Sequence, residues 1–396
     1  MKSEWKSCQL YEVADIVDSL HKTPQYTECG IPMLRVTDIK EGYLSLRSPA
    51  KVSPETYDEF TKKHMPKQGD IVVSRVGTYG VFAYVATKDK FCLGQNTAII
   101  IPHINEKFLY YSLISAGTKE YLNKIVTGST QKTISLKNIK AIPLSVPNDT
   151  IQERIADILS ALDDKIELNN KINENLERQA MAIFKSWFVE YTPFGGTAPK
   201  EWRNVILDNI TSLVTRGIAP KYSDNSDQTV INQKCIRNHM IDLSLARKHT
   251  PKAINEKWLQ YGDLLINSTG TGTLGRTAQV WFEPQNLTVD SHVTIVRPAK
   301  ENLIFYIGLW GISNEKEIES LHTGSTGQTE LPRERVKAME LLLPDNETLD
   351  RFNAIIAPMA AAIVSNHEEN QTLAEIRDAL LPKLMSGELD ISAIQL

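Results

Sequence analysis

The sequence repeats itself once at about half its length, and this repeat limits the possible fold more than any other feature. The string Thr-Gly-Ser-Thr at 127–130 returns unchanged at 323–326, and Gly69-Asp70-Ile71-Val72 returns as Gly262-Asp263-Leu264-Leu265. Matched apolar positions keep the same order with a shift of 196 or 197 residues: Trp5 and Trp202, Leu10 and Leu207, Ile99 and Ile295, Tyr110 and Tyr306, and Leu176 and Leu373. The pattern indicates a tandem duplication of one unit, in which a lobe is followed by a helix.

Each lobe is expected to combine short strands with a helix. Strands are predicted where apolar, β-branched runs are bounded by Gly or Pro, at 70–74, 96–101, 263–267 and 292–296. A helix is expected after the last of these strands in each half, around 108–125 and 303–321. The result is a mixed lobe of the α/β or α+β class, with about 150 residues, which is a normal domain size.

A long helical pattern follows each lobe, after the turns Pro147-Asn148-Asp149 and Pro344-Asp345-Asn346. Apolar residues then recur at steps of three or four: Ile155, Ile158, Leu162, Ile166, Leu176, Ala180, Ile183 and Trp187 in the first half, and Phe352, Ile356, Met359, Ile363, Leu373, Leu380 and Leu384 in the second. Such spacing over several heptads is typical of a coiled-coil helix. We therefore divide the chain into lobes at 1–148 and 192–344, a central helix at 149–191 and a C-terminal helix at 345–396.

Each helix carries two asparagines at matching positions of its apolar seam, Asn169 and Asn173 in the first and Asn366 and Asn370 in the second. A seam asparagine costs stability but fixes register and the choice of partner. If the helices pair antiparallel, both sets lie near the helix middles and can meet. A helix of about 36 residues is roughly 54 Å long, so the pair is predicted to act as a spacer between the lobes. The alternative is that each helix packs on its own lobe.

The motifs of the common catalytic sites are missing. The chain has no Walker A motif and no Pro-Pro pair, which excludes the Asn-Pro-Pro-aromatic run of many methyltransferases. Gly270-Thr-Gly272-Thr-Leu-Gly275 fits a dinucleotide-binding pattern, but a strand-like run follows it where such a site needs a helix. A glycine-rich hairpin turn is the better interpretation. The four cysteines form no CxxC pair and no HExxH is present, so neither a metal site nor a catalytic centre is expected.

Several runs near the two helices share a distinctive pattern. They are Leu136-Lys-Asn-Ile-Lys-Ala-Ile-Pro-Leu144, Ile151-Gln-Glu-Arg-Ile-Ala156, Ala161-Leu-Asp-Asp-Lys-Ile-Glu-Leu-Asn169, Phe184-Lys-Ser-Trp-Phe188 and Leu381-Pro-Lys-Leu-Met-Ser-Gly387. With these runs the chain resembles the specificity subunit of type I restriction–modification systems over its whole length. The helical motifs carry the resemblance, and the lobes contribute much less.

The resemblance implies two target-recognition domains that alternate with two helical spacers. Each recognition domain is expected to read one half of a split, asymmetric site in double-stranded DNA. The helices are expected to set the gap and to dock two methyltransferase subunits, which bring S-adenosylmethionine and methylate adenine. Motor-nuclease subunits that use ATP and Mg would join this core and cut unmodified DNA. The chain itself is expected to bind no cofactor.

The charge distribution fits a DNA partner better than the net charge of −4 does. The first lobe carries 19 basic against 14 acidic residues, a net +5, and the second carries 17 against 16, a net +1. The two helical blocks are acidic, at −4 and −6. DNA is therefore expected to meet the lobes, although the second lobe gives only weak electrostatic support.

DNA sequence is read by side chains that reach base edges, whereas Lys, Arg and small polar groups hold phosphates. Loops between strands are the natural place for both. The predicted contacts of the first lobe are Arg35, Thr37, Arg75, Thr78, Tyr79, Gln95, Asn96, Ser129, Gln131 and Lys132. Those of the second lobe are Asn232, Gln233, Lys234, Ser268, Thr269, Arg276, Ser291, His292, Ser325 and Gln328. The Thr-Gly-Ser-Thr loops supply N–H groups and hydroxyls suited to phosphate.

Three other interpretations stay open at this point. The chain could be a stand-alone nuclease or methyltransferase with an unrecognised site, a coiled-coil scaffold that does not bind DNA, or a recognition subunit of a different defence complex. No apolar run approaches the roughly 18–20 residues that cross a bilayer, and the first residues lack the apolar core of a secretory signal. A cytoplasmic location without a membrane partner is therefore expected.

Overall fold

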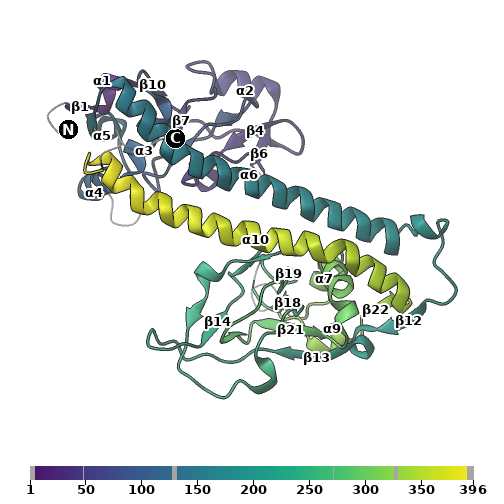
Figure 1. The fold of residues 1–396 in the computed structure, drawn as a ribbon. Helices are drawn as coiled ribbons and strands as arrows, with labels where there is room; N and C mark the ends of the chain where they lie inside the picture. The colour runs from purple at the N-terminus through teal and green to yellow at the C-terminus, as the bar shows by residue number, and fades with distance from the viewer. Residues whose placement is uncertain (1–4, 48, 127–131, 271, 325–328, 390–396) are drawn as a thin grey trace. The chain divides into compact units, whose positions relative to one another are not determined.

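The computed structural model describes residues 5–47, 49–126, 132–270, 272–324 and 329–389 (Figure 1). Contacts within the chain define two compact units. Unit 1 consists of Met1–Asn169 with Glu369–Leu396, and unit 2 consists of Asn170–Glu368. Each unit therefore holds one lobe and one part of each of two long helices.

The lobe of unit 1 is built on a five-stranded sheet with the order β2-β10-β7-β8-β5. Its strands are β2 (Ala14–Asp18), β10 (Thr97–Pro102), β7 (Ile71–Ser74), β8 (Phe82–Tyr84) and β5 (Gly42–Tyr43). A second sheet has the order β3-β6-β4-β9, with β3 (Tyr26–Thr27), β6 (Ala50–Val52), β4 (Ile31–Leu34) and β9 (Cys92–Leu93). The pair β1 (Lys6–Gln9) and β11 (Pro143–Val146) joins the start of the lobe to its end.

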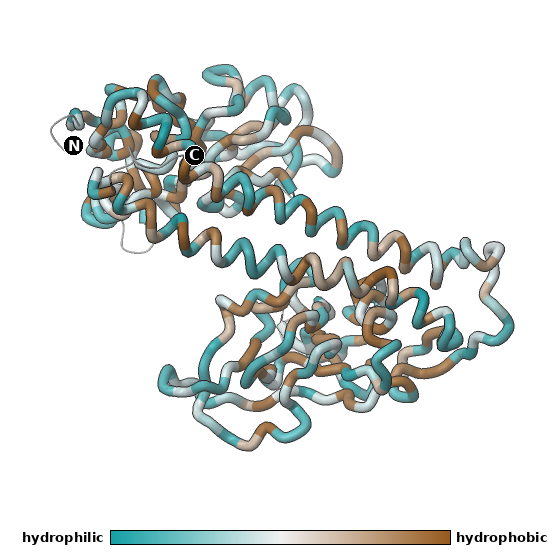
Figure 2. Tube along the Cα trace, in the orientation of Figure 1, coloured by the Kyte–Doolittle hydropathy of each residue, from teal (hydrophilic) through white to brown (hydrophobic). Residues whose placement is uncertain are grey.

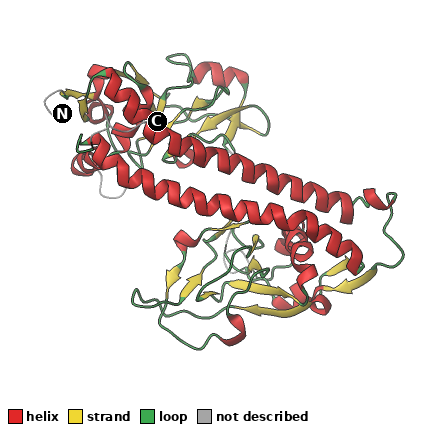
Figure 3. Cartoon of the chain, viewed as in Figure 1, coloured by secondary structure: helices red, strands yellow, loops and turns green. Residues whose placement is uncertain are grey.

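The main sheet of the lobe of unit 2 repeats the order of the first four strands, and Figure 3 shows strands and helices in both lobes. Its main sheet has the order β13-β21-β18-β19, with β13 (Thr211–Arg216), β21 (Val293–Pro298), β18 (Leu264–Asn267) and β19 (Thr277–Gln279). The other strands are β17 (Arg247–Lys248), β14 (Thr229–Ile231) and β20 (Leu287–Val289), the hairpin β15 (Ile236–Arg237) and β16 (Met240–Ile241), and the closing pair β12 (Arg203–Ile206) and β22 (Glu340–Leu343). The four strands predicted from the sequence correspond to β7, β10, β18 and β21.

The single helix expected in each lobe is two helices. In unit 1 these are α3 (Glu106–Ile114) and α4 (Ala116–Ile125), because Ser115 adopts an extended backbone and caps α4 through its hydroxyl. In unit 2 they are α7 (Ile304–Ser313) and α8 (Glu315–Ser320), which meet at Asn314. Serine and asparagine compete for backbone hydrogen bonds and so favour such breaks. The shorter helices are α1 (Leu10–Val13), α2 (Pro54–Phe60), α5 (Leu136–Lys140) and α9 (Arg333–Lys337).

The two long helices are α6 (Asp149–Phe188) and α10 (Asn346–Met385), each of 40 residues. Both start where the Pro-containing turns predict. The Asn148 side chain accepts a hydrogen bond from the Ile151 N–H at 3.0 Å, and Asp345 accepts one from the Thr348 N–H at 2.9 Å. Such side chains satisfy N–H groups that the first helical turn leaves unpaired. Among the described residues, no helix is long and apolar enough to span a membrane.

Each unit has a main apolar core that includes residues of both long helices. In unit 1, Ile155 and Leu159 of α6 and Leu384 of α10 join the core of the lobe. In unit 2, Phe184 of α6 and Phe352 of α10 do the same. Apolar segments recur along both helices in Figure 2. The helices thus complete the lobes, and burial of their apolar stripes is the main force that stabilises them.

Candidate DNA interface

Three loop segments of unit 1 come together where β7 ends and β10 begins in its main sheet. We call them loop cluster 1, which comprises residues 75–80, 94–96 and 132–134. The Arg75 N–H donates to the Asn96 carbonyl at 2.9 Å, and the Gly77 N–H donates to the Lys132 carbonyl at 3.0 Å. The Ile134 N–H in turn donates to the Arg75 carbonyl at 2.9 Å. Backbone hydrogen bonds therefore hold the three loops in one place.

Unit 2 contains an equivalent loop cluster 2, which comprises residues 232–235, 268–270, 272–276, 290–292 and 329–331. The Ser268 N–H donates to the His292 carbonyl at 2.8 Å, and the Leu331 N–H donates to the Ser268 carbonyl at 2.8 Å. These two bonds match those of Arg75 in cluster 1. The Asn267 side chain adds a hydrogen bond to the Gln233 carbonyl at 3.0 Å. The duplication thus extends to the backbone frame of the loops.

A glycine closes the hairpin turn at the centre of each cluster. The Gly80 N–H donates to the Ser74 carbonyl, and the Gly275 N–H donates to the Asn267 carbonyl, both at 2.8 Å. Both glycines have positive φ, 66° and 83°, which other residues adopt only with strain. Strand β19 begins at Thr277, two residues after Gly275. Gly270, Gly272 and Gly275 therefore belong to a hairpin turn, as the sequence predicts.

Several predicted contacts of cluster 1 already have partners inside the lobe. The guanidinium of Arg75 forms an ion pair with Asp18, and its Nε donates to the Ile134 carbonyl at 3.3 Å. Its side chain is only 12% exposed. The Tyr79 hydroxyl donates to Asn123 at 3.0 Å, and the exposed Lys132 lies 5.6 Å from the centre of the Tyr79 ring. Arg75 therefore supports the cluster, whereas Lys132 faces solvent.

The remaining predicted residues of the first lobe lie in cluster 1 or follow β4 and β9 of the second sheet. The Gly94 N–H donates to the Leu34 carbonyl at 2.8 Å, so Arg35 and Gln95 start from neighbouring strand ends. Arg35 forms a bidentate ion pair with Asp38, with distances of 2.9 and 3.0 Å. Thr37 and Thr78 are exposed, Gln95 bonds to Thr23 at 3.4 Å, and Asn96 holds a left-handed turn with φ of 63°.

In cluster 2, the side chains differ from those of cluster 1. Ser268 is fully buried and shares a hydrogen bond of 2.5 Å with Thr294, so it supports the turn rather than offering its hydroxyl to solvent. Thr269 shares a hydrogen bond of 2.8 Å with the Nδ1 atom of the exposed His292. Arg276 is half-buried, and its guanidinium has no hydrogen-bond or ion-pair partner among the described residues.

The other predicted residues of the second lobe surround these groups. Asn232 donates to the Leu245 carbonyl at 3.1 Å and accepts from the Lys234 N–H at 2.9 Å. Gln233 accepts from the Thr269 hydroxyl at 3.3 Å. Ser291 is half-buried next to Asp290, whose pKa is raised by burial although it accepts the His292 N–H. Four predicted contacts lie outside the described residues: Ser129, Gln131, Ser325 and Gln328.

An ion pair at the base of each cluster was missed by sequence reasoning. Arg75 pairs with Asp18 in unit 1, and Arg216 pairs with Glu330 in unit 2. Asp18 and Arg216 stand at equivalent strand positions, because they face Ala98 and Thr294, which are 196 residues apart. A signal was present, since both strands end in a charged residue at a matched position. The charge at this position has the opposite sign in the two halves, so a comparison of identical residues does not reveal the ion pairs.

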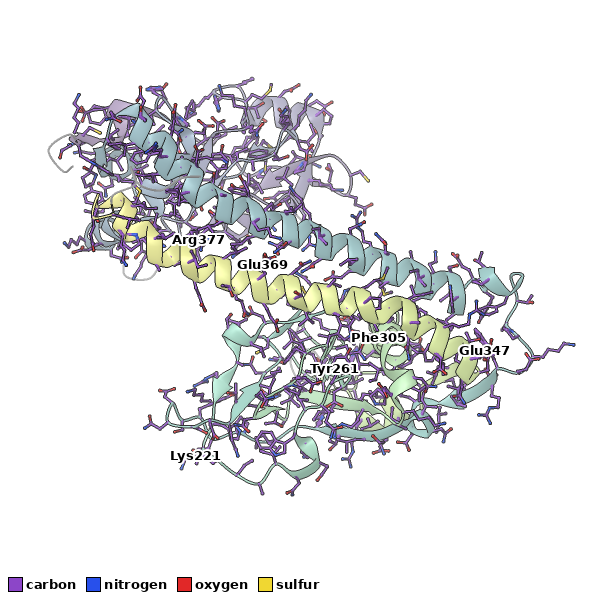
Figure 4. All side chains as sticks on the ribbon, viewed as in Figure 1. Lys221, Tyr261, Phe305, Glu347, Glu369 and Arg377 are labelled. Carbon is purple, nitrogen blue, oxygen red and sulfur yellow. The ribbon has the colours of Figure 1, made fainter. Side chains whose placement is uncertain are left out.

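The seam asparagines meet in pairs within each unit. In unit 1, Asn169 donates to Asn370 at 2.9 Å and to Glu369 at 2.7 Å, and Lys165 pairs with Glu369 at 2.9 Å. Figure 4 labels Glu369 and Arg377 on α10. In unit 2, Asn366 donates to Asn173 at 2.7 Å. Because low residue numbers of α6 meet high numbers of α10, the segments run antiparallel in each unit. We call these segments the helix pair of that unit.

Comparisons with known proteins agree with this architecture. Residues 2–178 match the family model of the type I restriction modification DNA specificity domain. The type I restriction enzyme MjaIX specificity subunit of Methanocaldococcus jannaschii is 27% identical over 406 residues, which cover 94% of this chain and 90% of that protein. The HindI specificity subunit of Haemophilus influenzae is 24% identical over 403 residues, which cover 82% of this chain and 87% of that protein.

A solved structure shares the fold. The S subunit of a type I restriction–modification system from M. genitalium aligns with a TM-score of 0.55 at 15% identity, over 96% of each chain. Two matched lobes, each completed by an antiparallel helix pair, define a duplicated mixed helix-and-sheet protein. Residues 2–178 thus match the specificity-domain family, and the chain is similar over most of its length to specificity subunits of type I restriction enzymes.

Proposed function

We propose that each lobe reads one half of a bipartite, asymmetric DNA target through its loop cluster. One observation carries the proposal: the two clusters share a backbone frame but present different side chains. Cluster 1 carries the exposed Lys132 and the half-buried Tyr79, whereas cluster 2 carries the exposed His292 and the half-buried Arg276. Two unequal half-sites require different base-reading side chains, and a backbone frame shared by both clusters can carry them.

The target itself tests this proposal. Methylation mapping in a host that carries the complete system should return a two-part motif whose halves differ. The base sequence recognised in one half-site should change when loop cluster 1 is replaced by the equivalent loops of another specificity subunit. The other half-site should stay unchanged. A palindromic or one-part motif in the unaltered system would refute the proposal.

The phosphate contacts can be tested through salt dependence. Replacing Lys132 by alanine should weaken binding to all sequences and reduce the slope of log K against log salt by about one. Lys124→Ala is the matched control, because Lys124 is also exposed but lies on α4 beside Glu120. Equal slopes for both variants would remove Lys132 from the interface.

Base reading can be tested in cluster 2. Arg276→Ala should relax the base preference in one half-site by about 1–3 kcal/mol, if the guanidinium forms a bidentate contact with a base. Arg333→Ala, at an exposed arginine paired with Glu334, is the control. A uniform loss over all targets would instead assign Arg276 to phosphate. The same scheme applies to Gln131 and Gln328, which are predicted from the sequence alone.

We further propose that the chain has no catalytic activity and directs other subunits. Two methyltransferase subunits would bring S-adenosylmethionine and methylate adenine, and motor-nuclease subunits with ATP and Mg would cut unmodified DNA. The likeness to specificity subunits supports this division of work. The isolated chain should neither methylate nor cut DNA with any of these cofactors, and methylation should appear when the methyltransferase is added. Turnover by the highly purified chain alone would contradict the proposal.

A further inference from the structure

Unit 2 contains an open cavity where its lobe meets its helix pair. The cavity volume is about 90 Å³, and the space between its lining side chains out to solvent is about 660 Å³. The lining comes from α6, the β15–β16 hairpin, the end of β19, α7 and α10, and it includes Met181, Met240, Trp281, Leu309 and His367. A concave, largely apolar site with a few polar groups is the usual form of a small-molecule pocket.

The polar groups of the lining are almost all satisfied within the protein. Gln279 donates to the carbonyls of Gly262 and Ile304 at 2.9 and 2.7 Å, and its oxygen accepts from the Trp281 indole at 2.7 Å. His239 pairs with Glu315 at 3.4 Å. The exception is His367, whose Nε2 atom is buried and has no hydrogen-bond partner among the described residues. Buried polar atoms without a partner are rare, because they are costly.

The equivalent part of unit 1 shows which side chains can occupy the volume of this cavity. In unit 1, Ile71 faces Tyr84, and in unit 2 the equivalent Leu264 faces Gln279, so Gln279 stands where the first half has a tyrosine. The Tyr84 ring lies 5.6 Å from the Tyr43 ring. Because Asn173 and Asn370 are equivalent, Ala180 of unit 2 stands where unit 1 has Arg377. Unit 2 therefore has smaller side chains than unit 1 at two positions that line the cavity.

We propose that this cavity binds a small, uncharged molecule with one aromatic ring and one hydrogen-bonding group. The ring takes the volume that corresponds to the Tyr84 side chain of unit 1, and it lies against Met181, Met240 and Trp281. Thioether sulfur and aromatic edges both contact such a ring favourably. The polar group bonds to Nε2 of His367. The small volume limits the ligand to one ring, and the apolar lining disfavours an ionised one.

Binding stabilises unit 2, because the ligand contacts both the lobe and the helix pair and is absent from the unfolded chain. The test uses the full-length chain with phenol as the probe, toluene as the probe without a hydrogen-bonding group, and benzoate as the charged one. Millimolar phenol should raise the unfolding midpoint by at least about 2 °C. Toluene should act more weakly, and benzoate should have no effect. An absent phenol effect, or an equal effect of benzoate, overturns the proposal.

Two variants locate the site. Ala180→Met places a larger side chain in the cavity and should abolish the phenol effect, whereas Ala379→Met makes the same change at an exposed position of α10 and should preserve it. His367→Leu should remove the advantage of phenol over toluene. Unchanged phenol binding in Ala180→Met overturns the proposal.

Hydrogen exchange of the unaltered chain gives a test that needs no variant. Phenol should slow exchange in the β15–β16 hairpin and in α7, which both line the cavity. The residues of unit 1 should exchange as before. Protection confined to unit 1 would place the binding elsewhere and overturn the proposal.

Discussion

Unit 1 fixes its lobe to its helix pair through hydrogen bonds to charged groups, whereas unit 2 uses a cluster of aromatic rings. In unit 1, Asp163 of α6 accepts from Tyr111 and from Arg377, both at 2.7 Å. The Tyr43 hydroxyl bonds to Asp164 at 2.5 Å. In unit 2, the ring of Phe188 on α6 lies 4.9 Å from that of Tyr306 on α7 of the lobe, and 4.8 Å from that of Phe352 on α10. One fold thus supports two attachments with different chemistry.

The exchange of chemistry is reciprocal when equivalent positions are compared. Asp163 and Arg377 correspond to Ala360 and Ala180, so unit 2 has no equivalent of this ion pair. Conversely, Phe352 corresponds to Ile155, so the aromatic cluster of unit 2 is aliphatic in unit 1. A hydrogen-bonded charge accepts few geometries, whereas ring packing mainly requires a filled volume. The polar contacts therefore add specificity to the pairing of α6 with α10, and the rings add buried area.

The largest expected difference between the units appears at high pH. Burial raises the pKa of Tyr43 and Tyr111, and the neighbouring aspartates raise it further. A folded-state pKa above the unfolded value of about 10 means that the stabilisation is complete below pH 10 and is lost as the pH rises above it. The tyrosines whose pKa is raised are Tyr43, Tyr57, Tyr84, Tyr110 and Tyr111 in unit 1, and Tyr261 and Tyr306 in unit 2. Near pH 11, hydrogen exchange by mass spectrometry should therefore show unit 1 opening first, and earlier opening of unit 2 would break the comparison.

Removing the central ring of unit 2 should come next in size. Phe352 is fully buried and contacts the rings of Phe184, Trp187 and Phe188. Phe352→Ala should cost about 4 kcal/mol in the unfolding free energy of unit 2, because the cavity is only partly refilled. Ile155→Val at the equivalent position should cost about 1 kcal/mol in unit 1. Urea unfolding followed by residue-resolved exchange measures both, and equal costs would show that the rings add nothing special.

Breaking the ion pair of unit 1 should cost somewhat less. Arg377→Ala leaves Asp163, which is 7% exposed, without its cation, and loss of one partner of a buried pair costs about 3 kcal/mol. Burial alone would lower the pKa of Arg377, but its bonds to Asp163 outweigh burial and raise it. Adding Asp163→Asn should restore part of the loss, because the orphaned charge is then gone. No recovery in the double variant would mean that Arg377 acts through packing alone.

Much of this architecture could be predicted from local sequence patterns. The strands, the long helices and the seam asparagines follow from periodicity, which is a property of neighbouring residues. The ion pairing of Arg75 could not be predicted, because its partner Asp18 is 57 residues away. The burial of Ser268 could not be predicted either, because its hydroxyl bonds to Thr294 on another strand. The contacts that fix each lobe to its helix pair could not be predicted from the sequence either. Asp163 has the spacing of an ordinary helix residue, and only the folded lobe brings Tyr111 to it.

The smallest expected effect separates two hydrogen bonds of the same network. Tyr111→Phe removes a donor to Asp163, whose side chain is 7% exposed, while Tyr43→Phe removes a donor to Asp164, whose side chain is 54% exposed. Water can replace the lost donor at Asp164 but not at Asp163, and a hydrogen bond to a buried charge contributes about 1.5–3 kcal/mol. We expect about 1.5 kcal/mol for Tyr111→Phe and about 0.5 kcal/mol for Tyr43→Phe, because the second carboxylate is screened by solvent. Both losses should appear in unit 1 alone when urea unfolding is followed by hydrogen exchange. If Tyr43→Phe proved as costly as Tyr111→Phe, exposure would not govern this network, and the attachment of unit 1 would depend on the arrangement of its rings, as that of unit 2 does.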